Sequence, residues 1–491
     1  ASNHEDTYMR VLSVDAWGKV TQEQRGNNLA ITSAYAASTG RLLSRCMGNS
    51  SCDLQLDTYN WDPLGNLLWR ERSAGATNAL GHSNLYNSAY AKYRETFAYD
   101  SLNRVISGQL GLYTTAVSAL PSLSATSLSM AYDALGNVCQ RSVNGNTLFM
   151  HYLNSAGCNG SAAAQNSMGV SSYSSPHALT RVSSSVGAAT FTSYGYDAHG
   201  NQVSAQNVGG STALPANRTV AYTPEQQAWR LAQGNELTRI FYGPDGARYR
   251  RIDQGGGSTT ETRYLGNVEL IVKNTVPQIR RYLAGVAVME INPTLNTRTV
   301  KRLLHDHLGS VSLAVSNDAS RMVLERYDYD AFGQRRAALG DPRGSWSYNP
   351  NQPPPTNRGF TGHEMLDAFG IVHMNGRIYD SRTARFLQAD PFVQEPNNPQ
   401  NFNRFTYLWN NPLNATDPSG YLGVKERQWL ATAVAIVGAV VFQQYQLLGT
   451  LGTWGTAGYF AAVGAISGGI ATQSWSGAAW GAFSGAVSAG W

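Results

Sequence analysis

Short apolar runs separated by one recurring turn phrase dominate the first 340 residues of the chain. The phrase consists of an aromatic residue, Asp, two variable residues, Gly and a polar residue, with apolar residues on both sides. An Asp side chain accepts hydrogen bonds from the backbone ahead of it, and Gly readily adopts the left-handed conformation that tight turns need. Each phrase therefore predicts a β-hairpin whose strands meet the turn at the flanking aromatic and apolar residues.

Seven related phrases lie between residues 14 and 334, one of which, Tyr99–Arg104, is a variant with Asn in place of Gly. They are Val14–Lys19, Trp61–Asn66, Tyr99–Arg104, Tyr132–Asn137, Tyr196–Asn201, Gly243–Arg248 and Tyr329–Gln334. Scattered turns in unrelated β domains would not repeat one phrase so often, so we assign its Asp and Gly residues a structural role. The residues assigned to turns are Asp62, Gly65, Asp133, Gly136, Asp197, Gly200, Asp330 and Gly333. Because no long helix is predicted between the hairpins, we expect an all-β fold with one continuous sheet.

The composition of the 491-residue chain agrees with many short strands joined by tight turns. Charged residues make up only 14% against the usual ~25%, and the chain contains 26 Tyr, 11 Trp and 49 Gly. This aromatic content argues against intrinsic disorder. The net charge of +5 is spread over scattered Lys and Arg residues, which argues against a nucleic-acid-binding protein. The one short basic cluster, Arg248, Arg250 and Arg251, is expected to form the solvated face of a strand.

Four cysteines leave the redox state of the chain open. Cys46 and Cys52 can close one local loop and Cys139 and Cys158 another, although four cysteines allow three pairings in all. Buried free thiols are an equal alternative, because the sequence does not reveal the compartment. No Cys-x-x-Cys spacing indicates a metal site.

Neither histidine motif points to a metal or a cofactor. His305 and His307 have an i, i+2 spacing, but no third ligand accompanies them, so we assign them to a turn. His363 and Glu364 lack the second His of a zinc-protease motif, so we assign them to core packing. The N-terminus has neither the basic nor the apolar region of a signal peptide and has no initiator Met, which predicts a fragment of a longer protein.

A more specific series of motifs lies between residues 304 and 421. In order, it comprises Leu304–Ser310 (LHDHLGS), Phe360–Glu364 (FTGHE), Asn375–Asp380 (NGRIYD), Ala384–Pro391 (ARFLQADP), Asn410–Asn414 (NNPLN) and Asp417–Gly420 (DPSG). Together with the turn phrases, this series resembles the RHS-repeat, or YD-repeat, proteins and their RHS-associated core domain over roughly residues 10–422. The family includes bacterial polymorphic toxins, the C component of insecticidal Tc toxins and the teneurin shells of animals.

The resemblance implies a hollow cocoon in which the repeat sheet spirals into a shell, the core plugs one end, and a C-terminal toxin is held inside. We therefore expect a repeat shell at residues 1–340, an exposed Pro/Gly/Asn-rich linker at 341–357, a core at 358–421 and a hydrophobic segment at 422–491. Within the core, residues 381–386 suit the start of a short helix that Pro391 would end early.

Two Asp-Pro pairs within the core carry the candidate chemistry. Asp390 and Asp417 lie 27 residues apart, which is far enough for the chain to return and bring them together. One protonated and one ionised carboxyl can jointly hydrolyse a peptide bond, and two close carboxyls share a proton because they do not both ionise easily. Isolated Asp-Pro pairs are otherwise ordinary turn formers.

The resemblance implies that these aspartates form an intramolecular aspartyl protease that cuts just after the DPSG phrase. We place the cut between Tyr421 and Leu422, although Tyr421 stands where the family usually has Leu. The family's assisting arginine maps to Arg385, which would hold one carboxylate ionised or bind the developing oxyanion. Arg377 is the alternative for this role.

The end of the chain has a different composition. After Arg427 there is no charged residue and no His, and the last 64 residues include 12 Gly and five Trp. Two apolar stretches within residues 429–471 are each too short to span a bilayer alone. One interpretation is a membrane-active cargo that contacts a membrane through these residues. The other, which we favour, is a hydrophobic linker against the shell interior, since such a segment would aggregate if exposed.

The leading hypothesis is therefore the C-terminal part of a polymorphic toxin that encapsulates its own C-terminus and releases it by one aspartyl self-cleavage. Such a protein is a secreted or delivered effector, at the bacterial surface or outside the cell, that serves interbacterial competition. Its expected partners are its own tail, secretion or delivery components and an immunity protein, with no cofactor. The alternatives are an uncleaved cell-surface adhesin that binds target-cell glycans through Tyr and Trp, and a scaffold whose aspartates only form turns.

Overall fold

The computed structural model describes residues 8–26, 29–48, 52–74, 92–112, 126–152, 158, 175–210, 217–318, 321–336, 354–393 and 395–421. Within these ranges the chain forms 31 β-strands and three 3-10 helices, and no α-helix. The strands of the main sheet are β1 (Met9–Val14), β2 (Val20–Arg25), β3 (Leu29–Tyr35), β4 (Leu42–Gly48), β5 (Gln55–Trp61), β6 (Leu67–Ala74), β7 (Lys92–Tyr99), β8 (Val105–Leu112), β9 (Thr126–Tyr132), β10 (Val138–Val143), β11 (Asn146–Tyr152), β12 (Leu179–Ser183), β13 (Phe191–Tyr196), β14 (Gln202–Val208), β15 (Arg218–Tyr222), β16 (Ala228–Gln233), β17 (Glu236–Tyr242), β18 (Arg248–Gly255), β19 (Ser258–Leu265), β20 (Val268–Lys273), β21 (Val276–Leu283), β22 (Ala287–Asn292), β23 (Thr297–His305), β24 (Val311–Ser316) and β25 (Val323–Arg326).

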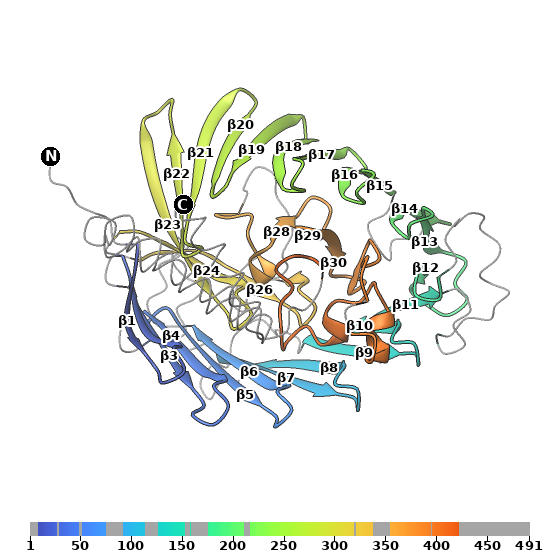
Figure 1. Cartoon of the computed structure of the whole chain (residues 1–491), viewed down its shortest axis with the longest axis horizontal. Coiled ribbons are helices and arrows are strands. Elements are labelled where there is room, and N and C mark those ends of the chain that lie inside the picture. Colours follow the sequence, from blue (N-terminus) through green and yellow to red (C-terminus); the bar gives the residue numbers. More distant parts are fainter. Residues whose placement is uncertain are drawn as a thin grey trace, which may run out of the picture. The chain divides into compact units, whose positions relative to one another are not determined.

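These twenty-five strands form a single antiparallel sheet in the described part of the chain. Each strand pairs with the next one along the sequence, from the β1–β2 pair to the β24–β25 pair, so the sheet is one long meander (Figure 1). Successive hairpins extend one sheet because each new strand satisfies the free backbone edge of the strand before it. The prediction of an all-β fold built on a continuous sheet is confirmed.

The turn phrases lie between consecutive strands, and the Asp of each phrase organises its turn. At Asp133, Oδ1 accepts hydrogen bonds from the backbone N–H of Leu135 at 2.9 Å and of Asn137 at 2.8 Å. Oδ2 accepts a third from the Asn137 side chain at 2.8 Å. Gly136 takes φ +78°, a conformation that a side chain would strain. The same pattern of an accepting Asp and a left-handed Gly recurs at Asp62 and Gly65, Asp197 and Gly200, and Asp330 and Gly333.

The LHDHLGS motif is a further turn of this kind, between β23 and β24. Oδ1 of Asp306 accepts hydrogen bonds from the backbone N–H groups of Leu308 at 2.9 Å and Ser310 at 2.8 Å. Nε2 of His307 lies 3.2 Å from the carbonyl oxygen of Leu413. The motif therefore places its second histidine against the backbone at Leu413, within the predicted core of residues 358–421.

Strands from early and late in the sequence pack against one another. Apolar residues of β3, β4 and the loop before β5 share one buried cluster with residues of β23, β24 and β25, namely Leu29, Ile31, Met47, Leu54, Leu304, Leu313, Val315 and Val323. Nη1 of Arg45 adds hydrogen bonds to the carbonyl oxygens of His305 at 3.0 Å and Asp306 at 3.1 Å. Burial of this apolar surface stabilises a contact that no local pattern in the sequence specifies.

Two disulfides are present, between Cys46 and Cys52 and between Cys139 and Cys158. Of the pairings and free-thiol states that the sequence left open, the structure therefore has the two local ones. The first closes the loop between β4 and β5, and the second joins β10 to the segment after β11.

Residues 356–393, 395–414 and 418–421 form a small segment, the core segment, that packs on the middle of the main sheet. The hairpin β26 (Asp328–Tyr329) and β27 (Arg335–Arg336) precedes it, and its own sheet contains β28 (Glu364–Leu366), β29 (Ile371–Met374), β30 (Arg377–Asp380) and β31 (Arg385–Phe386), with the 3-10 helices η2 (Phe360–Gly362), η3 (Pro399–Phe402) and η4 (Leu408–Asn410). Apolar residues around β28–β30 share a buried cluster with β15–β17: Val220, Ala228, Leu231, Ile240, Leu366, Phe369, Ile371, Ile378 and Leu387. Arg218 of β15 and Asp380 of β30 form a buried ion pair at 3.0 Å. Figure 1 shows this segment in orange beside the green strands β16–β18.

The expected short helix at residues 381–386 is wrong. Residues 381–384 form a turn, and β31 begins directly after it. Ala384 takes φ +58°, which a right-handed helix does not allow, so the chain reverses and pairs Asp380 with Arg385.

The chain divides into two compact units, one of residues 1–414 and 418–421 and one of residues 415–417 and 422–491. Of the second unit, the structure describes residues 415–417. The hydrophobic segment predicted at 422–491 lies outside the described residues, as does most of the linker predicted at 341–357. Thr356, at the end of that linker, is buried. Among the described residues, no helix has the length and apolar character needed to cross a membrane.

Candidate self-cleavage site

Arg377, at the start of β30, connects the Asp390 carboxylate with the backbone of the DPSG phrase. Its Nη2 lies 3.0 Å from Oδ2 of Asp390, and its Nε donates to the carbonyl oxygen of Gly420. Its Nη1 donates to the carbonyl oxygen of Arg404 at 3.1 Å, and the residue is only 3% exposed. One buried cation therefore lies between a candidate catalytic carboxylate and a carbonyl group one peptide bond before the predicted cut.

Asp390 is also buried, with 4% of its surface exposed. Its Oδ1 accepts a hydrogen bond from the backbone N–H of Phe392 at 2.9 Å, as expected of an Asp that forms a turn. Its backbone N–H donates to the carbonyl oxygen of Arg404 at 2.8 Å. Because the turn uses Oδ1 while Oδ2 faces Arg377, a turn-forming role and a chemical role are compatible in Asp390.

Arg385, the first candidate for the assisting arginine, has other partners. Its Nη1 donates to the hydroxyl of Tyr152 at 3.1 Å, and its Nη2 donates to the carbonyl oxygen of His177. Its guanidinium lies 4.9 Å from the centroid of the Tyr152 ring. These contacts tie β31 to the main sheet, and Arg377, not Arg385, makes the ion pair with Asp390.

The hairpin of β30 and β31 explains why Arg377 takes this place. The backbone N–H of Leu387 donates to the carbonyl oxygen of Ile378 at 2.8 Å, and the side chain of Gln388 accepts from the N–H of Ile378 at 2.8 Å. The residue before Ile378 therefore lies beside the residues that lead into Asp390. The family resemblance pointed to Arg385, whereas the pairing across the hairpin places Arg377 beside Asp390.

The other predicted site residues are partly described. Asp417 is buried, with 1% exposed, and belongs to the second compact unit. Leu422 lies outside the described residues. Tyr421 is partly buried, and this burial raises the pKa of its hydroxyl; the cation of Arg377 opposes the rise and the carboxylate of Asp390 adds to it. The ring of Tyr421 is therefore within electrostatic reach of both groups.

Comparison with known proteins gives one curated relative and several similar structures. No protein-family model matches the chain. Toxin subunit YenC1 of Yersinia entomophaga is 25% identical over 452 residues, which cover 85% of this chain and 42% of that protein. Crystal structures of TcdB2-TccC3 and TcdB2-TccC3-TEV match with TM-scores of 0.61 and 0.62, at 19% and 18% identity, over 84% of this chain and 20% and 19% of those chains. The Tc holotoxin pore of Photorhabdus luminescens matches with a TM-score of 0.60 at 18% identity, over 86% of this chain and 19% of that chain.

These matches support the resemblance of this chain to RHS-repeat, Tc-toxin-like proteins. Its long meander is the fold of the Tc-toxin RHS shell. The chain spans less than half the length of the curated relative and about a fifth of the length of the matched structures.

A buried histidine of the core segment contacts the DPSG phrase. His363 is 4% exposed, and its Nε2 lies 3.4 Å from the carbonyl oxygen of Pro418. Its Nδ1 lies 2.8 Å from the hydroxyl oxygen of Thr361. Burial, together with the nearby cations of Arg358 and Arg248, lowers the pKa of His363 to about 4, against the opposing effect of the Pro418 and Phe360 backbone groups. The imidazole is therefore neutral at pH 7 and packs in the core, as its GHE motif suggested.

The folded state is expected to lose stability as the pH falls from about 6.5 toward 4, because only the unfolded chain binds a proton on His363 in that range. A His363→Gln chain is expected to lose about 3 kcal/mol less than the wild type over this range. Urea unfolding at pH 7.5 and at pH 4 measures the difference. His199→Gln, in an exposed turn, is the control and should follow the wild type. Equal pH dependence of all three proteins would contradict the prediction.

Glu364 is the centre of a buried ionic cluster between the core segment and the main sheet. Its carboxylate is 0% exposed and forms ion pairs with Arg248 and Arg251 of β18. Oε1 also accepts hydrogen bonds from the Tyr264 hydroxyl at 3.1 Å and the Asn357 side chain at 2.8 Å. Burial alone would raise the pKa of Glu364, but the two arginines hold it well below its usual range. Glu364 is therefore ionised and joins β28 to β18.

The expectation that Arg248, Arg250 and Arg251 form a solvated strand face is wrong for two of them. Arg248 and Arg251 have side chains only 9% and 14% exposed, whereas Arg250 is 37% exposed and pairs with Glu261. The pairing of β17 with β18 shifts by one residue between Arg248 and Arg250. This irregularity breaks the alternation of faces, so Arg248 and Arg251 both reach the core.

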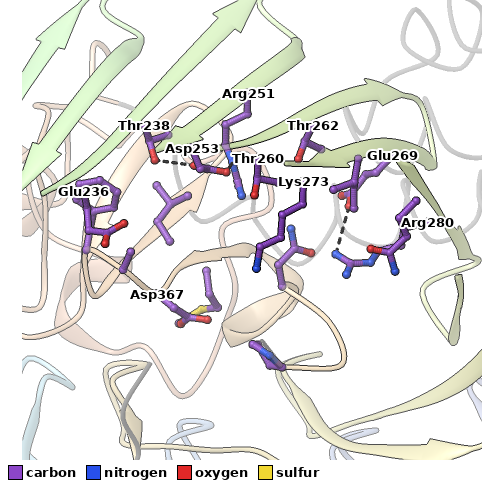
Figure 2. Close-up of a pocket in the computed structure, with 18 residues that line it drawn as sticks. Glu236, Thr238, Arg251, Asp253, Thr260, Thr262, Glu269, Lys273, Arg280 and Asp367 are labelled. Atoms are coloured by element: carbon purple, nitrogen blue, oxygen red, sulfur yellow. Dashed lines mark hydrogen bonds and ion pairs between the residues drawn. The ribbon is translucent and has the colours of Figure 1, made fainter. Parts of the chain in front are cut away.

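A polar cavity of about 230 Å³ lies beside this cluster, between β17–β21 and the core segment (Figure 2). Glu269, which is 2% exposed, lies at its wall, and its carboxylate is 3.6 Å from Nη1 of Arg280 and 3.7 Å from Nη2 of Arg358. Burial raises the pKa of Glu269, and the neighbouring Glu364 carboxylate raises it further. Glu269 at the cavity wall and Glu364 in the neighbouring cluster therefore have pKa values shifted in opposite directions.

Proposed function

We propose that this chain contributes to the encapsulating shell of an RHS toxin and cuts itself once, after Tyr421. The observation that carries the cleavage proposal is the Arg377 guanidinium, which contacts the Asp390 carboxylate and the Gly420 carbonyl oxygen at once. The similarity to toxin subunit YenC1 and to TcdB2-TccC3 supports the shell part of the proposal.

We assign residues 1–340 to the shell and residues 341–357 to a linker between the shell and the core. Residues 358–421 would close the shell and carry out the cleavage, and residues 422–491 would form the start of the cargo. An uncharged segment rich in Gly and Trp would aggregate in solution, so enclosure keeps it soluble until release. We infer that the protein acts outside its bacterium as a secreted or delivered effector. Its partners would then be delivery subunits, an immunity protein and its own C-terminal segment.

In the proposed reaction, Arg377 keeps the Asp390 carboxylate ionised, because an ion pair favours the charged form. Asp390 takes a proton from water as the water oxygen attacks the carbonyl carbon of Tyr421. Asp417, in its protonated form, donates a hydrogen bond to that carbonyl oxygen and stabilises the charge that develops on it. When the C–N bond breaks, the proton held by Asp390 passes to the leaving nitrogen. The products are a carboxyl group on Tyr421 and an amino group on Leu422.

An intact-mass spectrum of the purified full chain tests this function. We expect two species with the masses of residues 1–421 and 422–491, because hydrolysis adds one water and breaks one bond. Incubation for days at neutral pH should not produce further fragments. A single mass of the uncut 491-residue chain after that incubation would contradict the proposal.

A further inference from the structure

The turn between β29 and β30 lies along the residues that precede the proposed cut. Three successive carbonyl oxygens of the DPSG phrase accept hydrogen bonds from three successive residues of this turn. Pro418 O accepts from Nδ2 of Asn375 at 2.8 Å, Ser419 O accepts from the backbone N–H of Gly376 at 2.9 Å, and Gly420 O accepts from Nε of Arg377. This is the way an extended substrate is held by a binding cleft, with each bond fixing one backbone position.

Two glycines permit this close approach of the two backbones. Gly420 takes φ +75°, and a Cβ placed on it would lie 2.9 Å from the backbone nitrogen of Gly376 and closer still to the carbonyl oxygen of Met374. A Cβ placed on Gly376 would lie 2.6 Å from Cδ2 and 2.5 Å from Cζ of Tyr421. The Tyr421 ring therefore occupies the space that a side chain at position 376 would fill.

Tyr421 also adjoins open space. Tyr421 lines an open pocket of about 610 Å³ together with aromatic residues of β16–β18, among them Trp229, Tyr242 and Tyr249. The ring is thus restricted at Gly376 and unrestricted toward the pocket. The size of residue 376 is the steric limit on residue 421.

We propose that the turn Asn375–Arg377 is the specificity-determining element of the self-cleavage site. Its three hydrogen bonds set the register of the chain, and Gly376 admits an aromatic ring at position 421, just before the scissile bond. This inference rests on the proposed self-cleavage and assigns its substrate class, an extended segment with a small residue at 420 and an aromatic one at 421. It explains how Tyr421 is accommodated at a position where the resemblance described above predicts Leu.

A double-mutant cycle between positions 376 and 421 tests the proposal. The full chain is made by cell-free synthesis, and cleavage is followed in time by gel and mass spectrometry. Gly376→Ala is expected to slow cleavage at least tenfold or to move the cut to another bond, because the new methyl group displaces the Tyr421 ring. In a Tyr421→Ala background, which removes the ring, the same Gly376→Ala change is expected to alter the rate by less than threefold. Gly111→Ala in β8, where a Cβ would meet nothing within 4 Å, is the matched control and should be cut like the wild type.

The variants distinguish a failure of the specificity proposal from a failure of the proposed self-cleavage. Cleavage of Gly376→Ala at the same bond and at a rate close to that of the wild type would overturn the specificity proposal and leave the proposed function intact. A tenfold loss that persists in the Tyr421→Ala background would also overturn it, since the defect would then not depend on the ring. An uncut wild-type chain would overturn the proposed function and this inference with it.

Discussion

Purified Asp390→Asn protein is expected to remain a single uncut chain of 491 residues. Asn keeps an oxygen that can accept the hydrogen bond from the backbone of Phe392, so the turn should persist. It cannot take a proton from water, and loss of a general base lowers a rate by roughly 10²–10⁴. Asp417→Asn should have the same effect, because its amide is a much weaker acid than the protonated carboxyl proposed to stabilise the charge on the carbonyl oxygen. A denaturing gel and an intact-mass spectrum distinguish cut from uncut chains.

Asp62→Asn is the matched control for these variants, because Asp62 also precedes a Pro but lies in a turn of the repeat sheet. It should be cut like the wild type. Arg377→Gln should slow cleavage by at least about 10², the usual effect of losing one electrostatic partner at a reacting carbonyl. Arg385→Gln should slow it less, since its contacts are with the main sheet. A separate tail in both Asp→Asn variants would show that the aspartates do not perform the cut.

Glu364→Ala is expected to destabilise the packing of the core segment on the main sheet by about 3–5 kcal/mol, because it leaves Arg248 buried without its carboxylate partner. Arg251 loses one of its two carboxylate partners and keeps Asp253. The effect should appear as a lower urea midpoint and as faster proteolysis of the core segment. The difference in stability between wild type and Glu364→Ala should persist down to the usual Glu range. It should shrink only at lower pH, because the pKa of Glu364 in the folded state is held well below its ordinary value.

Glu261→Ala provides the comparison for this variant. Glu261 also pairs with two arginines, Arg250 and Arg263, but these side chains are 37% and 63% exposed. Exposed pairs contribute about 0–1 kcal/mol, since water already solvates both charges. Similar urea midpoints for Glu261→Ala and Glu364→Ala would contradict the assigned role of the buried cluster.

The hairpins and their turns could be predicted because the information for them is local. Within six residues, the phrase around Asp133 contains the acceptor, the donor groups and the left-handed Gly136 that the turn requires. The composition supported the prediction of an all-β fold, and the ordered core motifs indicated the family resemblance. The resemblance also directed attention to Asp390 and to the DPSG phrase, whose catalytic roles remain predictions.

The candidate site could be predicted less well, because its contacts join residues far apart along the chain. Arg385 lies nearer to Asp390 in sequence, yet Arg377 makes the ion pair through the β30–β31 hairpin. The importance of Gly376 has no signal in a single sequence beyond its place in the NGR motif. It follows only from the position of the Tyr421 ring.

The repeated hairpins follow from the sequence alone, because turn chemistry and strand alternation act over a few residues. Which charges are buried, and which groups surround the Asp390 carboxylate, depends on the tertiary fold. A one-residue shift in the pairing of β17 with β18 accompanies the contacts of Arg248 and Arg251 with Glu364. The pairing of β30 with β31 places Arg377 beside Asp390. Such contacts depend on strand register and packing across the whole sheet, which no local pattern specifies.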